Sequence, residues 1–272
     1  MFRPSDLMAF LNELGVAPKK SLSQNFLIDG NIIQKIIQSA SVKEGDSILE
    51  IGPGPGALTQ ALLNAGARVD AVELDSTYAN ALQRLQTPDQ RLIIHEADIL
   101  KFDPSILKGK YKVIANLPYH LTTPIITKLI PLQEQISSLT VMVQEEVARR
   151  FTAKSGCKEF GSISLFLQYW STPSYQFKIS RNCFYPKPKV DSAIIHLELH
   201  PPPIVSDADL FFTFIRTAFS ERRKMMRNPL KKLFSEEVIL KAFEKTGIRP
   251  DARAEMLNLQ QWIALFEVIT TL

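Results

Sequence analysis

Short apolar runs alternate with longer amphipathic segments between about Asp46 and Leu199. The runs DSILEIG, ARVDAVELD, RLIIHEADI, YKVIAN and LTVMVQ have the length and composition of buried strands. Between and after them stand segments with helical spacing of apolar residues, such as GALTQALLNAG, STYANALQRL, TPIITKLI and EEVARRF. This alternation predicts an α/β fold, in which helices cover both faces of a mostly parallel sheet.

The pattern changes toward the C-terminus. SYQFKIS and SAIIHLELH are strand-like runs with no evident helix between them, which predicts an antiparallel pair at one edge of the sheet. The proline-rich stretch HPPPIVSDAD then interrupts the pattern, and the remainder is helical. We therefore predict a domain of residues 1–205 that holds the sheet and a small all-helical domain of residues 206–272.

Composition narrows the class of protein. Of 272 residues, 45% are hydrophobic and 22% charged, which is typical of a globular protein with a sizeable core. The chain has no long uninterrupted apolar stretch, and its start has none of the parts of a secretory signal. Cys157 and Cys183 are too few for a disulfide framework and lack metal-ligand spacing. We expect a cytoplasmic protein without membrane or metal.

The net charge is +4, and its distribution is uneven. Locally basic segments lie at Lys19–Lys20, Arg149–Arg150, Lys187–Lys189 and Arg216–Lys232. Such patches indicate a polyanionic partner, although any one of them could equally be an ordinary solvated surface.

A glycine-rich loop, ILEIGPGPGALT, joins the first predicted strand to its helix. Gly52, Gly54 and Gly56 would let a ligand approach the backbone closely at a strand's carboxyl end. No Gly-Lys-Ser/Thr follows, and Ala57 stands where the third glycine of a dinucleotide loop belongs, so both phosphate-binding motifs are excluded. With Glu50 the loop resembles the S-adenosylmethionine loop of class I methyltransferases, which have a Rossmann-like fold.

Two carboxylates follow at the ends of the next strands. Glu73 ends the second strand, where an acidic residue can accept hydrogen bonds from both ribose hydroxyls, and Asp75 lies two residues further. Asp98 closes the third strand, where it could accept a hydrogen bond from an adenine amino group. Together with the loop, these residues predict a site for S-adenosylmethionine.

The fourth strand ends in an amide, in the stretch VIANLPYHLTT. Asn116 stands where the strand opens into a loop, before Leu117, Pro118 and Tyr119. Taken alone, this could be an ordinary turn, because Asn and Pro are common turn formers.

With that stretch the chain resembles the ribosomal RNA adenine dimethyltransferase family, and most closely its KsgA branch. The resemblance extends in family order over nearly the whole chain, through KKSLSQNFLID, EIGPGPGALT, VELD, ADIL, NLPY, FYPKPKVDSA, AFSERRKMMRN and RAEML.

The resemblance implies the cofactor site in detail. Asn25 and Leu27 would close over the methionine end of S-adenosylmethionine, and Gly52 would contact that end. Glu73 would bind the ribose, Asp98 the adenine amino group, and the backbone of Ile99 would lie along the adenine ring; Asn116 would also border the cofactor.

The resemblance and elementary chemistry together suggest how the target base is held. The carbonyl oxygens of the Asn116 side chain and the Leu117 main chain would accept the hydrogens of adenine N6 and point its lone pair at the methyl group. Pro118 favours an extended Leu117, and Tyr119 offers a face for stacking. Phe184 is the expected second stacking surface; the alternative is a core residue.

A basic helical face is predicted after the linker. Between Phe211 and Arg227 apolar residues share one face, while Arg223, Lys224 and Arg227 lie on another and could bind RNA phosphates. Arg222 falls on the apolar side, and Asn228–Pro229 predicts the start of a new helix.

These observations predict an S-adenosylmethionine-dependent enzyme that dimethylates N6 of two adjacent adenines in the 3′-terminal hairpin loop of 16S ribosomal RNA, acting as a monomer on a pre-assembled small subunit during its biogenesis. The alternatives are an Erm-type large-subunit RNA methyltransferase, an inactive ribosome-assembly or mitochondrial transcription protein, and a DNA adenine methyltransferase.

Overall fold

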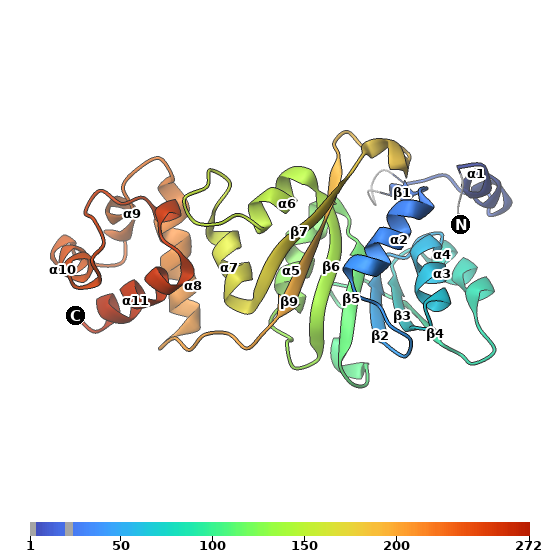
Figure 1. Ribbon diagram of the computed structural model, residues 1–272, viewed down its shortest axis with the longest axis horizontal. Coiled ribbons are helices and arrows are strands. Elements are labelled where there is room, and N and C mark those ends of the chain that lie inside the picture. The colour runs from blue at the N-terminus through green and yellow to red at the C-terminus, as the bar shows by residue number, and fades with distance from the viewer. Residues whose placement is uncertain (1–3, 20–23) are drawn as a thin grey trace. The chain divides into compact units, whose positions relative to one another are not determined.

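The structure is a computed structural model that describes residues 4–19 and 24–272 (Figure 1). Lys20 and the centre of the KKSLSQ motif lie outside the described residues. The chain divides into two compact units, residues 1–148 with 172–200, and residues 149–171 with 201–272. The second unit therefore contains not only the segment after the predicted linker but also residues 149–171, which the predicted domains assign to the first.

The first unit is built on a seven-stranded sheet of order β4-β3-β2-β5-β6-β9-β7. Parallel pairing joins β2 to β3 and β5, β3 to β4, and β5 to β6. β9 pairs antiparallel with β6, and β7 lies beside β9 at the edge of the sheet, where the sequence placed these two late strands. The predicted mostly parallel sheet with an antiparallel pair is confirmed. The strands span Ser47–Ile51 (β2), Arg68–Glu73 (β3), Leu92–Glu96 (β4), Tyr111–Asn116 (β5), Ile136–Gln144 (β6), Ser171–Ile179 (β7) and Ser192–Leu199 (β9).

Helices flank this sheet (Figure 1). α2 and α3 pack through Ile36, Ile37, Leu62 and Leu63 onto a cluster of buried strand side chains that includes Ile114. α5 lies on the other face. The helices of this unit are Pro4–Glu13 (α1), Gly30–Ser39 (α2), Ala57–Asn64 (α3), Ser76–Ala81 (α4) and Thr122–Leu129 (α5). Glu145–Phe151 (α6) runs into the second unit, to which Ser162–Trp170 (α7) belongs.

Strand register brings the predicted site residues to one level. Ile51 pairs with Val72 on one side and with Ala115 on the other. The next residue along each strand is Gly52, Glu73 or Asn116, and all three therefore stand at the same carboxyl edge of the sheet, where open α/β sheets bind ligands.

A second, two-stranded sheet was not predicted from the sequence. β1 (Phe26–Leu27) pairs antiparallel with β8 (Phe184–Tyr185), with Leu27 opposite Phe184.

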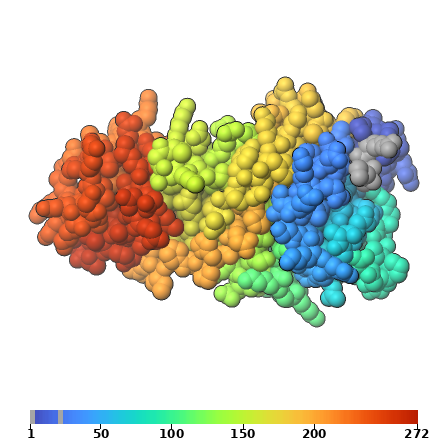
Figure 2. Space-filling model, in the orientation of Figure 1, coloured from blue at the N-terminus to red at the C-terminus, as the bar shows by residue number. Residues whose placement is uncertain are grey.

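On the face shown in Figure 2, the surface around α2 (blue) adjoins that around β7 (yellow). Lys35 of α2 lies 5.9 Å above the ring of Phe177 of β7, consistent with this packing.

The second unit has its own apolar core, as expected for an independent compact unit. Fully buried aromatic side chains dominate it, namely Phe160, Phe211, Phe214, Phe243, Trp262 and Phe266. After the linker its helices are Ala208–Ala218 (α8), Arg227–Leu230 (α9), Glu236–Thr246 (α10) and Leu259–Thr270 (α11). The prediction that this part of the chain is helical is confirmed.

The predicted continuous helix from Phe211 to Arg227 is wrong. α8 ends at Ala218, a short 3₁₀ turn and an irregular stretch follow, and α9 begins at Arg227 with Met226 before it, rather than at Asn228. Arg222 lies in this break, and its guanidinium donates hydrogen bonds of 2.6 and 2.8 Å to the main-chain oxygens of Lys158 and Phe160.

Candidate active site

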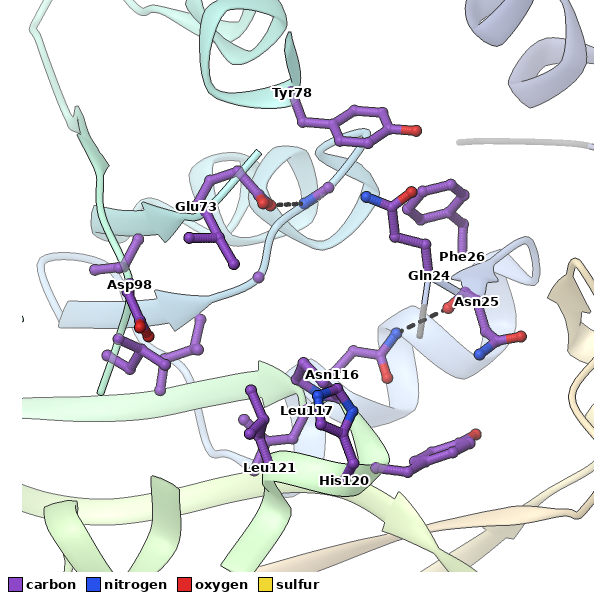
Figure 3. A pocket seen from close by; sticks show the side chains of 18 of the residues that line it. Gln24, Asn25, Phe26, Glu73, Tyr78, Asp98, Asn116, Leu117, His120 and Leu121 are labelled. Carbon is purple, nitrogen blue, oxygen red and sulfur yellow. Dashed lines mark hydrogen bonds between the residues drawn. The ribbon is translucent and has the colours of Figure 1, made fainter. Parts of the chain in front are cut away.

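A cavity of about 190 Å³ opens at the carboxyl edge of the sheet (Figure 3). Its lining comes from β1, the glycine loop, the ends of β3 and β4 and the loop after β5. Of the residues singled out from the sequence, it brings together Asn25, Gly52, Glu73, Asp98, Ile99, Asn116, Leu117 and Tyr119.

The glycine loop has the backbone form that its sequence indicates. Gly52 has a φ of +66°, a conformation in which other residues are strained, and its amide donates a hydrogen bond to the main-chain oxygen of Val72. A Cβ at Gly54 would lie 3.0 Å from the ring of Phe26. The loop is therefore compact, and it leaves its backbone next to the cavity.

Glu73 links this loop to the neighbouring strand. Its Oε2 accepts from the amide of Gly54 and its Oε1 from the amide of Asp75, both at 2.9 Å, and the side chain is buried at the cavity wall. Burial raises the pKa of Glu73 above its usual value, although these backbone hydrogen bonds act against the rise. Each oxygen retains a lone pair, so the carboxylate can still accept from two ribose hydroxyls.

Asp98 and Ile99 form the far wall. One carboxylate oxygen of Asp98, Oδ1, accepts from the amide of Leu100 at 2.9 Å, which shapes the turn after β4. Lys128 of α5 donates from Nζ to the main-chain oxygens of Ile99, Leu100 and Phe102 at 3.0, 2.8 and 2.7 Å. Lys128 thereby ties this loop to α5. Sequence reasoning missed it, because a lone lysine in an amphipathic helix gives no signal of such a role.

The loop after β5 carries the amide and the tyrosine. The Asn116 side chain donates from Nδ2 to the main-chain oxygen of Asn25 at 3.1 Å. Tyr119 borders the cavity, and its hydroxyl is 2.8 Å from Oγ of Ser192 on β9. Burial raises the pKa of Tyr119, so it stays neutral at physiological pH. Both side chains are therefore held by partners far away in the sequence.

Leu27 and Phe184 lie beside the site without lining this cavity. Phe184 is only 3% exposed and belongs to the buried cluster under α2 and α3, as in the core alternative stated above. Leu27 borders a smaller neighbouring cavity of about 50 Å³ together with Glu50, Gly52 and Asn116. A stacking role for Phe184 stays a prediction, and it requires the side chain to leave this position.

The three residues predicted to bind RNA differ in their surroundings. Arg223 is exposed, whereas Nζ of Lys224 lies 2.7 Å from Oε2 of Glu221 and Arg227 is half-buried. Of these three, only Arg223 is both exposed and outside the ion pairs found within the described chain.

In the described ranges, 4–19 and 24–272, no helix combines the length and apolar character of a membrane span. The same residues contain no cluster of three or more His, Cys, Asp or Glu side chains arranged to hold a metal ion.

The parallel sheet with its glycine loop and its row of polar strand ends defines a Rossmann-like methyltransferase. The model of the ribosomal RNA adenine dimethylase family matches residues 16–271. The chain belongs to this family, as its sequence motifs predicted. The predicted enzyme class, an S-adenosylmethionine-dependent methyltransferase of ribosomal RNA adenine, is thereby confirmed.

Relatives agree with this assignment, and solved structures share the fold. The chain is 54% identical to ribosomal RNA small subunit methyltransferase A of Protochlamydia amoebophila, over 98% of this chain and 96% of the relative. It is 41% identical to the protein of the same name from Chlamydia trachomatis, over 97% of this chain and 96% of the relative. A dimethyladenosine transferase from Plasmodium falciparum shares the fold, with a TM-score of 0.77 and 24% identity; the match covers 88% of this chain and 95% of that structure. The 23S rRNA methyltransferase ErmE also shares the fold, with a TM-score of 0.72 and 24% identity; this match covers 90% of this chain and 99% of that structure.

If Glu73 accepts from the ribose as predicted, its replacement by alanine should weaken S-adenosylmethionine binding by roughly 1–3 kcal/mol, since these acceptors are lost and the amide of Gly54 loses its partner. Calorimetry measures this directly. Glu96→Ala is the matched control, since Glu96 pairs with Glu73 in the sheet register but is exposed and outside the cavity. Equal affinities of the two variants would place the ribose elsewhere.

Proposed function

We propose that the protein transfers methyl groups from S-adenosylmethionine to N6 of two adjacent adenines in the 3′-terminal hairpin loop of 16S ribosomal RNA, giving N6,N6-dimethyladenine. The substrate is a pre-assembled small subunit, and the enzyme acts as a cytoplasmic monomer during biogenesis of that subunit. The high identity to small subunit methyltransferases A over nearly the whole chain supports the choice of subunit.

The cofactor would supply an electrophilic methyl group, and the cavity has groups to hold it. Glu73 would accept hydrogen bonds from the ribose hydroxyls, and Asp98, through the oxygen that does not cap its own turn, from the adenine amino group. The backbone of Ile99 would lie along the adenine ring, and Gly52 would contact the methionine end. Asn25, just before β1, and Leu27, within β1, would close over the methionine end.

The amide of Asn116 carries the proposal for the reaction itself. Its Nδ2 is engaged by the carbonyl of Asn25, and its Oδ1 accepts from no donor within the described chain, so this oxygen can receive a hydrogen from the target amino group. The main-chain oxygen of Leu117 would receive the other hydrogen. Two acceptors make the nitrogen more pyramidal and direct its lone pair at the methyl group, which is catalysis by alignment.

Stacking and proton loss complete the reaction. Tyr119 presents its ring at the cavity, where it can stack on a base drawn out of a loop. The methylated nitrogen is acidic enough to lose its proton to water, so the chain need not provide a strong base. A neutral amide acceptor also tolerates the second transfer, when only one hydrogen remains.

The test is to incubate the protein with labelled S-adenosylmethionine and unmethylated small subunits, large subunits or DNA, and to map the modified nucleosides by mass spectrometry. We expect dimethyladenine at two adjacent positions of the small-subunit RNA only. A mark on the large subunit would support the Erm-type alternative, and no transfer at all would support an inactive assembly factor.

We further propose that Arg223, Lys224 and Arg227 contact RNA phosphates. Because Arg223 is exposed and takes part in none of the ion pairs found among the described residues, Arg223→Glu should weaken binding to subunits and reduce the slope of log affinity against log salt by about 1–2. Lys241→Glu on α10 is the control, since it makes the same charge change at another exposed position of this unit. Indistinguishable salt dependence of both variants would make the Arg223 face an ordinary solvated surface.

A further inference from the structure

The orientation of the Asn116 amide is determined by one main-chain carbonyl. The oxygen of Asn25 accepts from Nδ2 of Asn116 at 3.1 Å (Figure 3). Because a carbonyl can be met only by the NH₂ end of an amide, this contact decides which end of the side chain is left for the substrate. The position of the Asn25 main chain therefore matters to the reaction proposed above.

On its C-terminal side, Asn25 is held by the small sheet. Phe26 pairs with Tyr185, and its ring meets Tyr78 edge to face with centroids 5.4 Å apart. These contacts fix the chain just after Asn25. They leave open what holds the chain before it.

Just before Asn25, the side chain of Gln24 makes two hydrogen bonds. Its Nε2 donates to Oδ2 of Asp75 at 3.3 Å, and its Oε1 accepts from the amide of Lys19 at 2.7 Å. Nζ of Lys19 lies 2.8 Å from the same Oδ2 of Asp75. One buried carboxylate oxygen of Asp75 thus accepts hydrogen bonds from the side chains of both Gln24 and Lys19.

Asp75 is itself rigidly placed. Its side chain is 4% exposed, its Oδ1 caps α4 by accepting from the amide of Thr77 at 3.1 Å, and its own amide donates to Glu73. Burial by itself would raise the pKa of Asp75, but hydrogen bonds from Lys19, Thr77 and Gln24 lower it below its usual value. The carboxylate is therefore ionised at neutral pH and is a fixed acceptor.

We infer that Asp75 is a positioning residue for methyl transfer: through Gln24 it holds the Asn25 carbonyl where that carbonyl orients the Asn116 amide. The inference rests on the proposed role of Asn116. It assigns Asp75, which the sequence placed only near the ribose, to the target-base side of the reaction.

Asp75→Asn is the variant that separates positioning from capping. Asparagine caps helices as well as aspartate does, so α4 keeps its cap, but an amide nitrogen cannot accept from Gln24 and Lys19. At saturating cofactor and subunits we expect kcat to fall about 100-fold, as for a reacting group displaced by about 1 Å, with the KM for subunits unchanged.

Asp46→Asn is the matched control. Asp46 lies just before β2, at the opposite end of that strand from the site, and its Oδ2 is likewise 2.8 Å from a lysine, Lys112. It therefore loses a comparable ion pair, and its kcat should equal that of the wild type. Gln24→Leu is a second test, because it removes the link to Asn25 while Asp75 keeps its pair with Lys19 and its cap of α4; its kcat should also fall.

The side-chain ¹H–¹⁵N signal of Asn116, assigned by its loss in Asn116→Ala, reports the amide itself. It should move in Asp75→Asn and Gln24→Leu and stay in place in Asp46→Asn. Wild-type kcat in both test variants would overturn the inference, as would a lower kcat with an unmoved amide signal. If Asp75→Asn does not fold, Gln24→Leu alone decides. Absence of methyl transfer by the wild type would instead refute the proposed function.

Discussion

Asn116→Ala is expected to lower the rate of methyl transfer by about 100-fold or more, as when one aligned polar group is lost from a reaction site. Alanine removes the acceptor Oδ1 from the end of β5, so the target nitrogen is no longer held with its lone pair toward the methyl group. The main-chain oxygen of Leu117 remains, which is why some residual transfer should persist.

The measurement is single-turnover transfer to unmethylated small subunits, with cofactor affinity determined separately by calorimetry. Affinity should change much less than the rate, because the ribose and adenine contacts proposed for Glu73 and Asp98 remain. Asn64→Ala controls for loss of an amide elsewhere, since Asn64 is exposed at the end of α3. Near-normal turnover in Asn116→Ala would remove the basis of the proposed mechanism.

Glu50→Gln should remove a large pH dependence of stability. Glu50 is 1% exposed on the inner strand β2, and its Oε2 has no hydrogen-bond partner in the described part of the chain. Burial raises the pKa of Glu50 to about 8, and the negative charge of Glu73 adds to the rise. In the unfolded chain the same group ionises near its ordinary value of 4.5.

The sign follows from proton binding. Between pH 4.5 and about 8 the folded protein holds a proton on Glu50 that the unfolded chain has lost, so the free energy of unfolding decreases as the pH rises. Glutamine is neutral throughout. The difference in unfolding free energy between Glu50→Gln and the wild type should therefore shift by roughly 3–4 kcal/mol in favour of the variant between about pH 5 and pH 8.

Urea unfolding of both proteins across this pH range measures the shift. Glu96→Gln is the control, because it makes the same substitution at an exposed position. Parallel curves for Glu50→Gln and the wild type would mean that Glu50 is already ionised in the folded protein.

Local pattern was sufficient for much of the fold. The apolar runs of the sheet, the helices that alternate with them and the helical C-terminal segment were all predictable, because each shows its periodicity within about ten residues. That Gly52, Glu73 and Asn116 lie at the same edge of the sheet was predictable too, because neighbouring parallel strands have their carboxyl ends at one edge. Membership of the family followed from motifs that are read in order along the chain.

Contacts between distant segments could not be read in this way. The pairing of Leu27 with Phe184 joins two short runs that have no strand pattern of their own, and it places Phe184 in the core rather than at the cavity. The carbonyl partners of Arg222 lie more than 60 residues away in the sequence, and Lys128 is recognisable only once the loop after β4 lies beside α5.

The sequence by itself therefore determined the class of fold, the family and the residues that stand at the strand ends, because these depend on local periodicity and on motif order. Only the tertiary structure decided how those residues are held: Asn116 by the carbonyl of Asn25, Gln24 by Asp75, and Tyr119 by Ser192. Each of these hydrogen bonds joins segments about 50 to more than 90 residues apart. The physical reason is that a hydrogen bond between distant segments depends on how the whole chain packs, and no local pattern encodes that.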